Sequence, residues 1–454
     1  MSQKRLTSEE TYHRMIHTPI PKLIVQLGLP TIASMLISSI YNMADTYFVG
    51  TLGKSASGAI GVVFSLMAIL QAFGFLYGHG SGSLLSRKLG QQDITSASKY
   101  GSTGFFLALA TGIIIGVLGL AFLTPLMYLL GTTDTILPHA RQYAFFILLG
   151  APFFVGSCVL NNILRYEGMS LFAMIGLVSG GLLNILLDPL FILVFHMGTA
   201  GAGLATALSQ CVSFSILLFM FLSKKTACRL HIRNFTRNIR DIGKIITTGL
   251  PSLIRQGLGG FSGMLLNHQA GIYGDAAVAA MSIVNRISQF IFSVNIGIGQ
   301  GFQPVASFNF GAKKYSRVKQ GFWFATLFSE ALLGITSVIC LFFAEPLVQL
   351  FQHDPSVVTI GIPALRLQSV ACLFLPFFSC GNMMFQSTGQ SGRASLLAML
   401  RNGVWFIPLI IVLPALFGLN GVISAQPISD LLSFLVATPL VMHFLRHLPQ
   451  DQTS

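Results

Sequence analysis

Long apolar stretches separated by short polar breaks repeat along the whole chain. The clearest one runs from Gly101 to Leu130 and contains no Asp, Glu, Lys or Arg. A helix of that length exceeds the roughly 30 Å thickness of a bilayer's hydrocarbon core. The pattern predicts an all-α membrane protein with twelve transmembrane helices, over residues 27–50, 58–80, 101–130, 143–164, 171–195, 199–222, 245–271, 277–300, 320–343, 358–385, 395–416 and 420–444.

The two halves of the chain resemble each other at a nearly constant offset. An offset of 221 pairs Leu29-Pro30 with Leu250-Pro251, and it continues through Gly53/Gly274, Gly80/Gly301 and Gly90/Gly311. Near the ends an offset of 220 pairs Gly198 with Gly418. Matched glycines also arise by chance in a chain with 46 of them, but a register held from the first span to the last favours duplication. We therefore predict a six-helix lobe over residues 1–222, a basic linker over 223–244 and a second six-helix lobe over 245–454.

An even number of spans per copy gives both lobes the same orientation. The pseudo-two-fold axis then runs along the membrane normal, with a cavity between the lobes. Rocking one lobe against the other would expose this cavity to each side in turn, which is the design of a transporter.

Composition supports the membrane interpretation, because 53% of the residues are hydrophobic and only 9% are charged. The net charge of +13 could indicate nucleic acid, but the basic residues lie mainly in short loops, where Lys and Arg set membrane topology. Of the 27 Lys and Arg, 21 fall on the side of the two termini, three on the opposite side (Lys54, Arg141 and Arg366) and three inside spans (Arg255, Arg286 and Arg401). We expect both termini in the cytoplasm of a bacterium, with the chain in the inner membrane, and no nucleic-acid partner.

Only four acids lie within the predicted spans: Asp45, Asp188, Glu330 and Asp430. A carboxylate in hydrocarbon costs about 2.5 kcal/mol or more, so each is either satisfied inside the bundle or functional. Counting about 1.5 Å per residue from the helix ends places Asp45, Asp188 and Thr206 about 8–12 Å below the outer surface, in one layer of the first lobe. Asn184 shares a helix face with Asp188, and Pro189 cannot donate to the carbonyl of Ile185.

These groups form a candidate site for a proton or sodium ion. Two nearby carboxylates would raise one pKa, so that a proton could load and leave near neutrality.

The chain resembles the multidrug and toxic compound extrusion (MATE) family, in its prokaryotic branch that includes a staphylococcal-type drug exporter. The resemblance covers all twelve spans and rests on the stretches 42–50 (NMADTYFVG), 184–189 (NILLDP), 198–206 (GTAGAGLAT), 297–304 (GIGQGFQP) and 309–313 (NFGAK). It implies a cation-coupling site of Asp45, Asn184, Asp188 and Thr206, with Tyr143 beside it and a helix break at Pro189. The tenth predicted span, 358–385, carries no acid between Gly361 and Gln386. This departs from some members of the family, which have a second-lobe ion site with an acid on that helix.

Other residues have weaker claims to function. Arg255 and Gln256 are candidates for lining the substrate cavity, and Met264 and Met281 for a pliable drug-binding surface, although methionine is more often core filler. Glu330, Asp430, Arg286 and Arg401 could serve packing or function equally. The six cysteines have no metal-type spacing, so we expect no firmly bound metal and no cofactor beyond the coupling ion, H⁺ or Na⁺.

The resemblance implies a monomeric secondary antiporter that exports varied, mostly cationic amphipathic drugs by alternating access. No Walker-type motif occurs, so ATP is not its direct energy source. A flippase for a lipid-linked saccharide in the same superfamily is the nearest alternative. A membrane enzyme would need a polar catalytic cluster in a loop, which the sequence lacks, and a channel fits a duplicated twelve-helix chain poorly.

Overall fold

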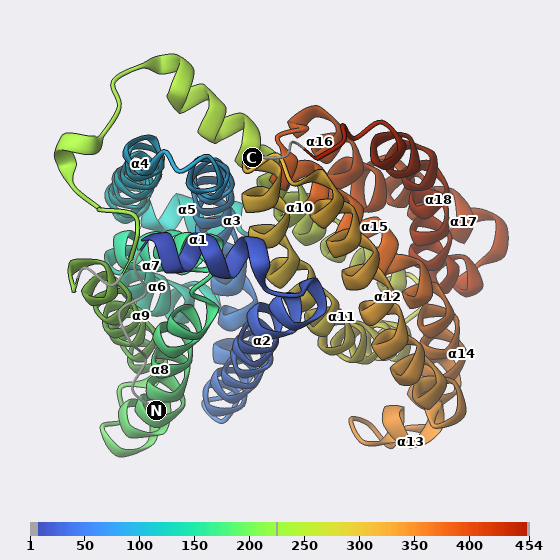
Figure 1. Ribbon diagram of the computed structural model, residues 1–454. Coiled ribbons are helices and arrows are strands. Elements are labelled where there is room, and N and C mark those ends of the chain that lie inside the picture. Colours follow the sequence, from blue (N-terminus) through green and yellow to red (C-terminus); the bar gives the residue numbers. More distant parts are fainter. Residues whose placement is uncertain (1–7, 224–225, 452–454) are drawn as a thin grey trace.

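Helices are the main structure in residues 8–223 and 226–451, the part of the chain that the computed structural model describes, and this part contains no strand (Figure 1). Four basic residues of the topology count, Lys4, Arg5, Lys224 and Lys225, lie outside this part. A short helix, α1 (Ser8–His17), precedes the first lobe. The helices of that lobe are α2 (Ile20–Gly50), α3 (Lys54–Gly90), α4 (Ile94–Ala121), α5 (Leu123–Leu129), α6 (Leu137–Leu149), α7 (Ala151–Tyr166), α8 (Ser170–Pro189), the π-helical turn η1 (Leu190–Val194) and α9 (Gly198–Leu222).

The second lobe follows a linker that holds the short 3₁₀ turn η2 (Ile232–Asn234). Its first helix begins at Ile239, six residues before the predicted start of that span at residue 245. The elements of this lobe are α10 (Ile239–Gly271), α11 (Asp275–Gly311), α12 (Tyr315–Phe342), α13 (Ala344–Gln349), α14 (Pro355–Ala371), η3 (Cys372–Phe374), α15 (Leu375–Thr388), α16 (Ser391–Met399), the π-helical turn η4 (Leu400–Trp405), α17 (Phe406–Phe417) and α18 (Leu419–Arg446).

The prediction of twelve spanning helices in two lobes is confirmed. In the described residues, ten spans are long and apolar enough to cross a membrane, and the pair α6–α7, bent by 54°, makes an eleventh. The twelfth is α10, which is 33 residues long and less apolar because it carries Arg255, Gln256, Asn267 and His268. The first half of this helix packs against α3 of the first lobe, with contacts from Ile245 to Gln256, so that half is shielded from lipid on one side.

The prediction of one continuous helix over 101–130 is wrong. The helix α4 ends at Ala121, and α5 starts separately at Leu123. Pro125 lies four residues after Ala121, and a proline ring clashes with the carbonyl at that position. Proline also marks the breaks in two other spans, because Pro152 lies in the first turn of α7 and Pro376 in the first turn of α15.

Backbone geometry repeats between the lobes as the glycine register predicts. Residues with positive φ occur at matching positions, as in Gly53 (116°) and Gly274 (99°). The same holds for a pair that is not glycine, Gln92 (60°) and Lys313 (58°). Two further pairs follow the same rule, Gly168/Gly389 and Gly198/Gly418. Equivalent turns therefore join equivalent helices, as expected for a duplicated unit.

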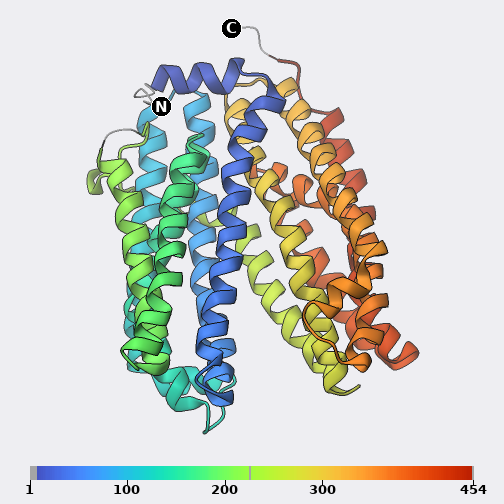
Figure 2. The same ribbon diagram turned by 90° about the horizontal axis from the view of Figure 1, so that it is seen from below.

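The lobes meet at one end of the molecule and diverge toward the other (Figure 2). We call the joined end the basic end, because the loops there carry most of the Lys and Arg. Glycines allow this contact: a Cβ on Gly80 of α3 would lie 2.1 Å from the carbonyl oxygen of Ile245 on α10. Its repeat mate Gly301 on α11 faces Gly28 on α2 in the same way, with a Cβ contact of 2.6 Å. The interface is thus built twice, once by each copy of the repeat.

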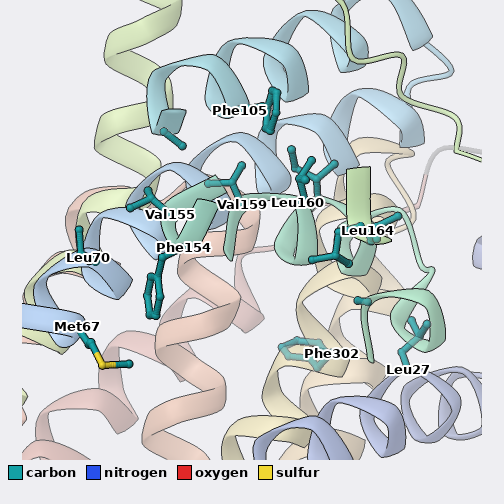
Figure 3. Close-up of a cluster of buried hydrophobic side chains, with 14 of the residues drawn as sticks. Leu27, Met67, Leu70, Phe105, Phe154, Val155, Val159, Leu160, Leu164 and Phe302 are labelled. Atoms are coloured by element: carbon teal, nitrogen blue, oxygen red, sulfur yellow. The ribbon is translucent and has the colours of Figure 1, made fainter. Parts of the chain in front are cut away.

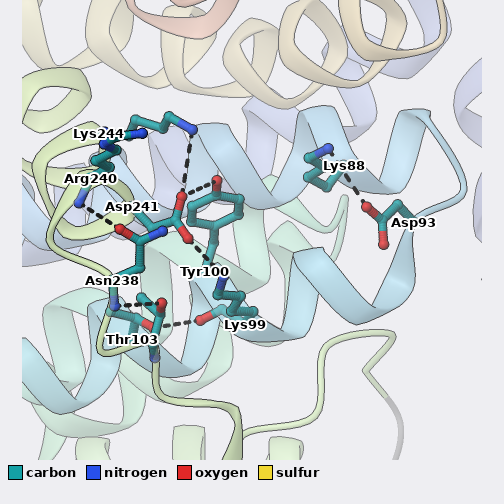
Figure 4. Close-up of polar contacts among 10 residues, drawn as sticks. Lys88, Asp93, Lys99, Tyr100, Thr103, Asn238, Arg240, Asp241 and Lys244 are labelled. Atoms are coloured by element: carbon teal, nitrogen blue, oxygen red, sulfur yellow. Dashed lines mark hydrogen bonds and ion pairs between the residues drawn. The ribbon is translucent and has the colours of Figure 1, made fainter.

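Hydrogen bonds between the lobes follow the same distribution. In the described part of the chain they run from Gln71–Gln256 (3.2 Å), near the middle of α3 and α10, to the basic end. His79 and Ser252 share one at 2.7 Å. At the basic end Lys99 of α4 pairs with Asp241 of α10 at 2.7 Å, and Tyr100 donates to the same carboxylate at 3.3 Å (Figure 4).

A buried apolar cluster also continues from one lobe to the other at this end. It includes Leu160 and Leu164 of α7, Leu27 of α2 and Phe302 of α11 (Figure 3). A second, separate core, which contains Leu333 and Phe406, fills the rest of the second lobe. The lobes are therefore closed at the basic end and held apart at the opposite end.

Candidate functional site

The predicted site residues lie on four helices of the first lobe, toward the end opposite the basic end. Asp45 is in the last turns of α2, and Asn184 and Asp188 are in the last turns of α8. Thr206 lies in the early part of α9, and Tyr143 lies in the middle of α6. Because α8 packs against both α2 and α9, the fold brings side chains 161 residues apart in sequence into one layer.

Two hydrogen-bonded groups make up the site. Tyr143 donates its hydroxyl to Asp45 Oδ2 at 2.7 Å. Asn184 Nδ2 donates to Asp188 Oδ1 and to Thr206 Oγ1, each at 3.3 Å. All five side chains are at most 3% exposed.

Several oxygen atoms of this site lack a hydrogen-bond donor in the described part of the chain. They are Asp45 Oδ1, Asp188 Oδ2 and Asn184 Oδ1, together with Ser209 Oγ one turn further along α9. Buried polar atoms are nearly always paired, so three unpaired oxygens in this layer and a fourth one turn away need an explanation. A proton on a carboxylate or a small cation among the oxygens would satisfy them. Oxygen atoms are suitable ligands for sodium, whereas a soft transition metal prefers thiolate or imidazole ligands.

Local helix geometry loosens the backbone beside Asp188. The α-helical hydrogen-bond pattern of α8 ends at Pro189 and is replaced by the π-helical turn η1. A proline has no N–H to donate, and π-helical turns are frequent at functional sites. The hydrogen-bond pattern of this span therefore changes directly after Pro189, next to the carboxylate, while the span continues to Val194.

A cavity in the first lobe opens onto this layer. It has about 880 Å³ of empty space, part of it open to solvent, and Asn184, Thr206 and Ser209 line it. Its walls continue toward the basic end through Asn161, Asn162 and Arg165. Sequence reasoning missed Ser209, Gln210 and the asparagines of α7 as wall residues, because neutral polar side chains are common in helices of a bundle interior and carry no depth signal.

The two polar candidates for the substrate cavity lie at the contact between the lobes. Arg255 Nη1 donates to Asn382 Oδ1 at 3.1 Å and lines a smaller cavity in the second lobe. Gln256 Nε2 donates to Gln71 Oε1, which belongs to the wall of the first-lobe cavity.

The two methionine candidates differ in their surroundings. Met264 on α10 is 60% exposed and so is available to a ligand or to lipid. Met281 on α11 is only 5% exposed and belongs to the apolar core of the second lobe. Because it is packed by its own lobe, Met281 is a core residue in this structure and does not lie on the predicted drug-binding surface.

The remaining charged residues separate into a bound pair and two isolated groups. Arg401 Nε bonds Asp430 Oδ1 at 2.7 Å, and Gln426 and Gln368 also donate to this carboxylate, at 2.8 and 3.3 Å. Glu330 is half-buried on α12, and it forms no hydrogen bond within residues 8–223 and 226–451. Arg286 on α11 is exposed. In the described residues, no three His, Cys, Asp or Glu gather as a metal cluster.

The comparisons with known proteins agree on one family. The MatE family model matches the chain twice, over residues 30–190 and 251–412, which correspond to the two lobes. The chain is 30% identical over 442 residues to "Multidrug export protein MepA" of Staphylococcus aureus strain MRSA252, covering 96% of this chain and 97% of the relative. It is 29% identical over 436 residues to the protein of the same name from Staphylococcus haemolyticus, covering 95% of this chain and 96% of that one.

A solved structure gives the same result at the level of the fold. It is described as an outward-facing conformation of a multidrug resistance MATE family transporter of the MOP superfamily. It superposes with a TM-score of 0.91 at 25% identity and covers 99% of both chains.

Proposed function

Because this chain belongs to the MatE family of membrane transporters, we propose that it is an ion-coupled antiporter that exports varied, mostly cationic amphipathic drugs. The name of its staphylococcal relatives supports multidrug export as the substrate class. The observation that carries ion coupling is the set of unpaired buried oxygens around Asp45 and Asp188. We further propose that the coupling ion is H⁺ or Na⁺ and that no other cofactor is needed.

The geometry of the lobes supports a transport cycle by alternating access. The basic loops support placing the closed end in the cytoplasm, and in this proposal the described state therefore faces outward. An ion from outside would reach Asp45 and Asp188 and neutralise negative charge in a layer that is otherwise buried. Ion binding would thus stabilise one arrangement of the first lobe over another, which is how a ligand shifts a conformational equilibrium.

Competition between ion and drug would make the exchange obligatory. A cationic drug in the first-lobe cavity and an ion at the carboxylates would both be attracted by the same negative charge. Binding of one lowers the affinity for the other, and this coupling is reciprocal by linkage. In this proposal the π-helical turn η1 after Pro189 is the place where the end of α8 would change its hydrogen bonds during the exchange.

We place the protein in the bacterial inner membrane as a multi-pass monomer with both termini in the cytoplasm. The asymmetry of Lys and Arg between the two sides supports the orientation. Its partners in this proposal are small-molecule drugs and the lipid bilayer.

Drug transport by everted membrane vesicles under defined gradients tests this proposal. We expect ethidium to accumulate in the vesicles under an imposed proton or sodium gradient, and accumulation to stop when an ionophore collapses that gradient. Vesicles without the protein are the control. Transport that persists without either gradient would contradict ion coupling. Binding of a lipid-linked saccharide, with no binding of a panel of amphipathic cations, would favour the flippase.

A further inference from the structure

The second lobe contains a small pocket of its own with a mostly apolar lining, and its charged wall residues are arginines, whereas those of the first lobe's site are carboxylates. Arg255 of α10 and Arg401 of the π-helical turn η4 line it. Asn382 of α15, Asn402 of η4 and Phe292 of α11 also line it. The rest of the wall, around about 430 Å³ of empty space, is formed by Ile296, Phe378, Ser379, Met383 and Ala398. Two cationic side chains in one pocket within the membrane are costly unless anions balance them.

The charge of Arg401 is balanced and its position is fixed. Asp430, which is 1% exposed, holds Arg401 Nε at 2.7 Å. The guanidinium also lies over the ring of Phe292, with 5.0 Å from Cζ to the ring centroid. These two contacts fix the orientation of Arg401 in the wall of the pocket, and Asp430 balances its charge.

The charge of Arg255 has no such balance. Within residues 8–223 and 226–451 it forms no ion pair, and its one hydrogen bond goes to the neutral Asn382. Asn382 is anchored by its own bond to the carbonyl of Ala394 at 2.6 Å. Counting Arg255, Arg401 and Asp430, the pocket and its immediate surroundings carry a net charge of +1.

The positive pocket lies next to the first-lobe cavity. Gln71 lines that cavity, and it accepts a hydrogen bond from Gln256, the neighbour of Arg255 in the chain. One elongated molecule between the lobes could therefore direct a cationic end toward the carboxylates of the first lobe and an anionic end toward Arg255. Guanidinium groups bind carboxylates through paired, charge-assisted hydrogen bonds, which provide geometric selectivity as well as attraction.

We propose that the pocket of Arg255 and Arg401 binds the carboxylate of zwitterionic amphipathic substrates. This inference rests on the proposed export function, because it adds a substrate class to the same transporter. The carboxylate supplies the charge that Arg255 lacks, and Asn382 and Asn402 add neutral donors around it. A substrate without a carboxylate gains nothing from this pocket.

A matched pair of dyes tests the inference in the purified, full-length protein. Rhodamine 110 has a free carboxylate, and rhodamine 123 is its methyl ester. The two dyes therefore differ only in the carboxylate that the pocket is proposed to bind. We expect the wild-type protein to bind rhodamine 110 more tightly in fluorescence polarisation. Arg255→Gln should weaken rhodamine 110 by about tenfold or more and leave rhodamine 123 within about twofold, with Arg255→Lys recovering part of the loss.

Matched variants separate the pocket from a general effect of charge. Arg286→Gln removes one exposed arginine of the same lobe and should change neither dye by more than about twofold. Arg401→Gln alone would leave Asp430 unpaired, so the double variant Arg401→Gln/Asp430→Asn is used, and it should also weaken rhodamine 110 selectively.

Three results would overturn the inference: equal binding of both dyes by the wild type, equal loss of both in Arg255→Gln, or an Arg255-dependent effect of chloride without any preference for the free acid. The last result would identify an inorganic anion site. If the wild type transports neither dye nor any other amphipathic cation, the proposed function itself fails. If rhodamine 123 is exported normally and the acid is not preferred, only this inference fails.

Discussion

At the residue scale, the buried acids were the part of the site most accessible to sequence reasoning. Asp45 and Asp188 stand out because a carboxylate within an apolar helix is costly, and helix rise alone places them in one layer. Ser209 gave no such signal, since serine is common in membrane helices, yet its hydroxyl is one of the unpaired oxygens. Met281 was misassigned because composition does not reveal which side of a helix faces the core.

The two carboxylates lead to a graded set of expectations for transport. Asp188→Asn should reduce gradient-driven efflux to the background of vesicles without the protein, because the amide keeps the shape but cannot exchange a proton or balance a cation. Asp45→Asn should do nearly the same, while Thr206→Ala should cost only about fivefold, the value of one neutral hydrogen bond. Glu330→Gln, the matched control, should keep most of the activity. Wild-type rates in both Asp variants, normalised to protein level, would assign coupling to other residues.

A second prediction concerns Glu167, in the turn between α7 and α8 at the basic end. Burial raises the pKa of Glu167 to about 8, although the N–H groups of Ala227 and Cys228, each donating at 3.0 Å, oppose that rise. The folded protein then binds more protons than the unfolded chain between the ordinary pKa of about 4.5 and 8, so stability should fall as pH rises through this window. Thermal unfolding in detergent should show that fall, and Glu167→Gln should flatten it. Parallel curves for the two proteins would contradict the assignment.

At the element scale, the apolar pattern predicts where spans lie better than where they break. The long spans follow from runs such as 101–121, whereas the separate helix α5 follows from a single residue, Pro125. The π-helical turns η1 and η4 were beyond sequence reasoning, because they depend on packing between helices as well as on local residues. The helix α1 was missed because it is short and polar, with no apolar run to mark it.

Contacts of α1 suggest a role as a strap across the closed end. Arg14 donates to the carbonyl of Gly168 in the first lobe at 3.1 Å. Arg317 of the second lobe donates to the carbonyls of Met15 and Thr18 at 3.2 and 2.6 Å. We expect Arg317→Gln to loosen the basic end, which would appear as faster maleimide labelling of Ser86→Cys in a background without the native cysteines. Arg446→Gln, an exposed arginine at the same end, is the control. Equal labelling in the two variants would show that the strap does not hold the lobes together.

At the scale of the whole molecule, duplication explains both the symmetry and its limits. The offset register predicted two lobes of equal orientation, and the repeated positive-φ positions follow it. The chemistry of the lobes has nevertheless diverged. Thr206 of the first-lobe site corresponds to Gln426 at the offset of 220, and Gln426 donates to the paired Asp430 instead of to an ion site. A sequence register reports the backbone that two copies share, while such side-chain partners follow only from three-dimensional packing.

Alternating access requires the basic end to open, and a covalent link there should prevent it. Ser83 of α3 and Ser307 of α11 place their hydroxyls 3.5 Å apart across the lobes. The double variant Ser83→Cys/Ser307→Cys should lose transport on oxidation and regain it on reduction. Each single variant, treated in the same way, should be unaffected. Full transport by the oxidised, cross-linked protein would show that the lobes need not separate at this end.

The most direct test of the central claim is the movement of the ion itself. Purified protein in liposomes, with a pH-sensitive or sodium-sensitive dye inside, reports whether a drug gradient drives the coupling ion in the opposite direction. We predict that a drug gradient produces such an ion flux in the wild type and none in Asp188→Asn. Drug movement without any opposed flux of H⁺ or Na⁺ in the wild type would contradict ion-coupled antiport.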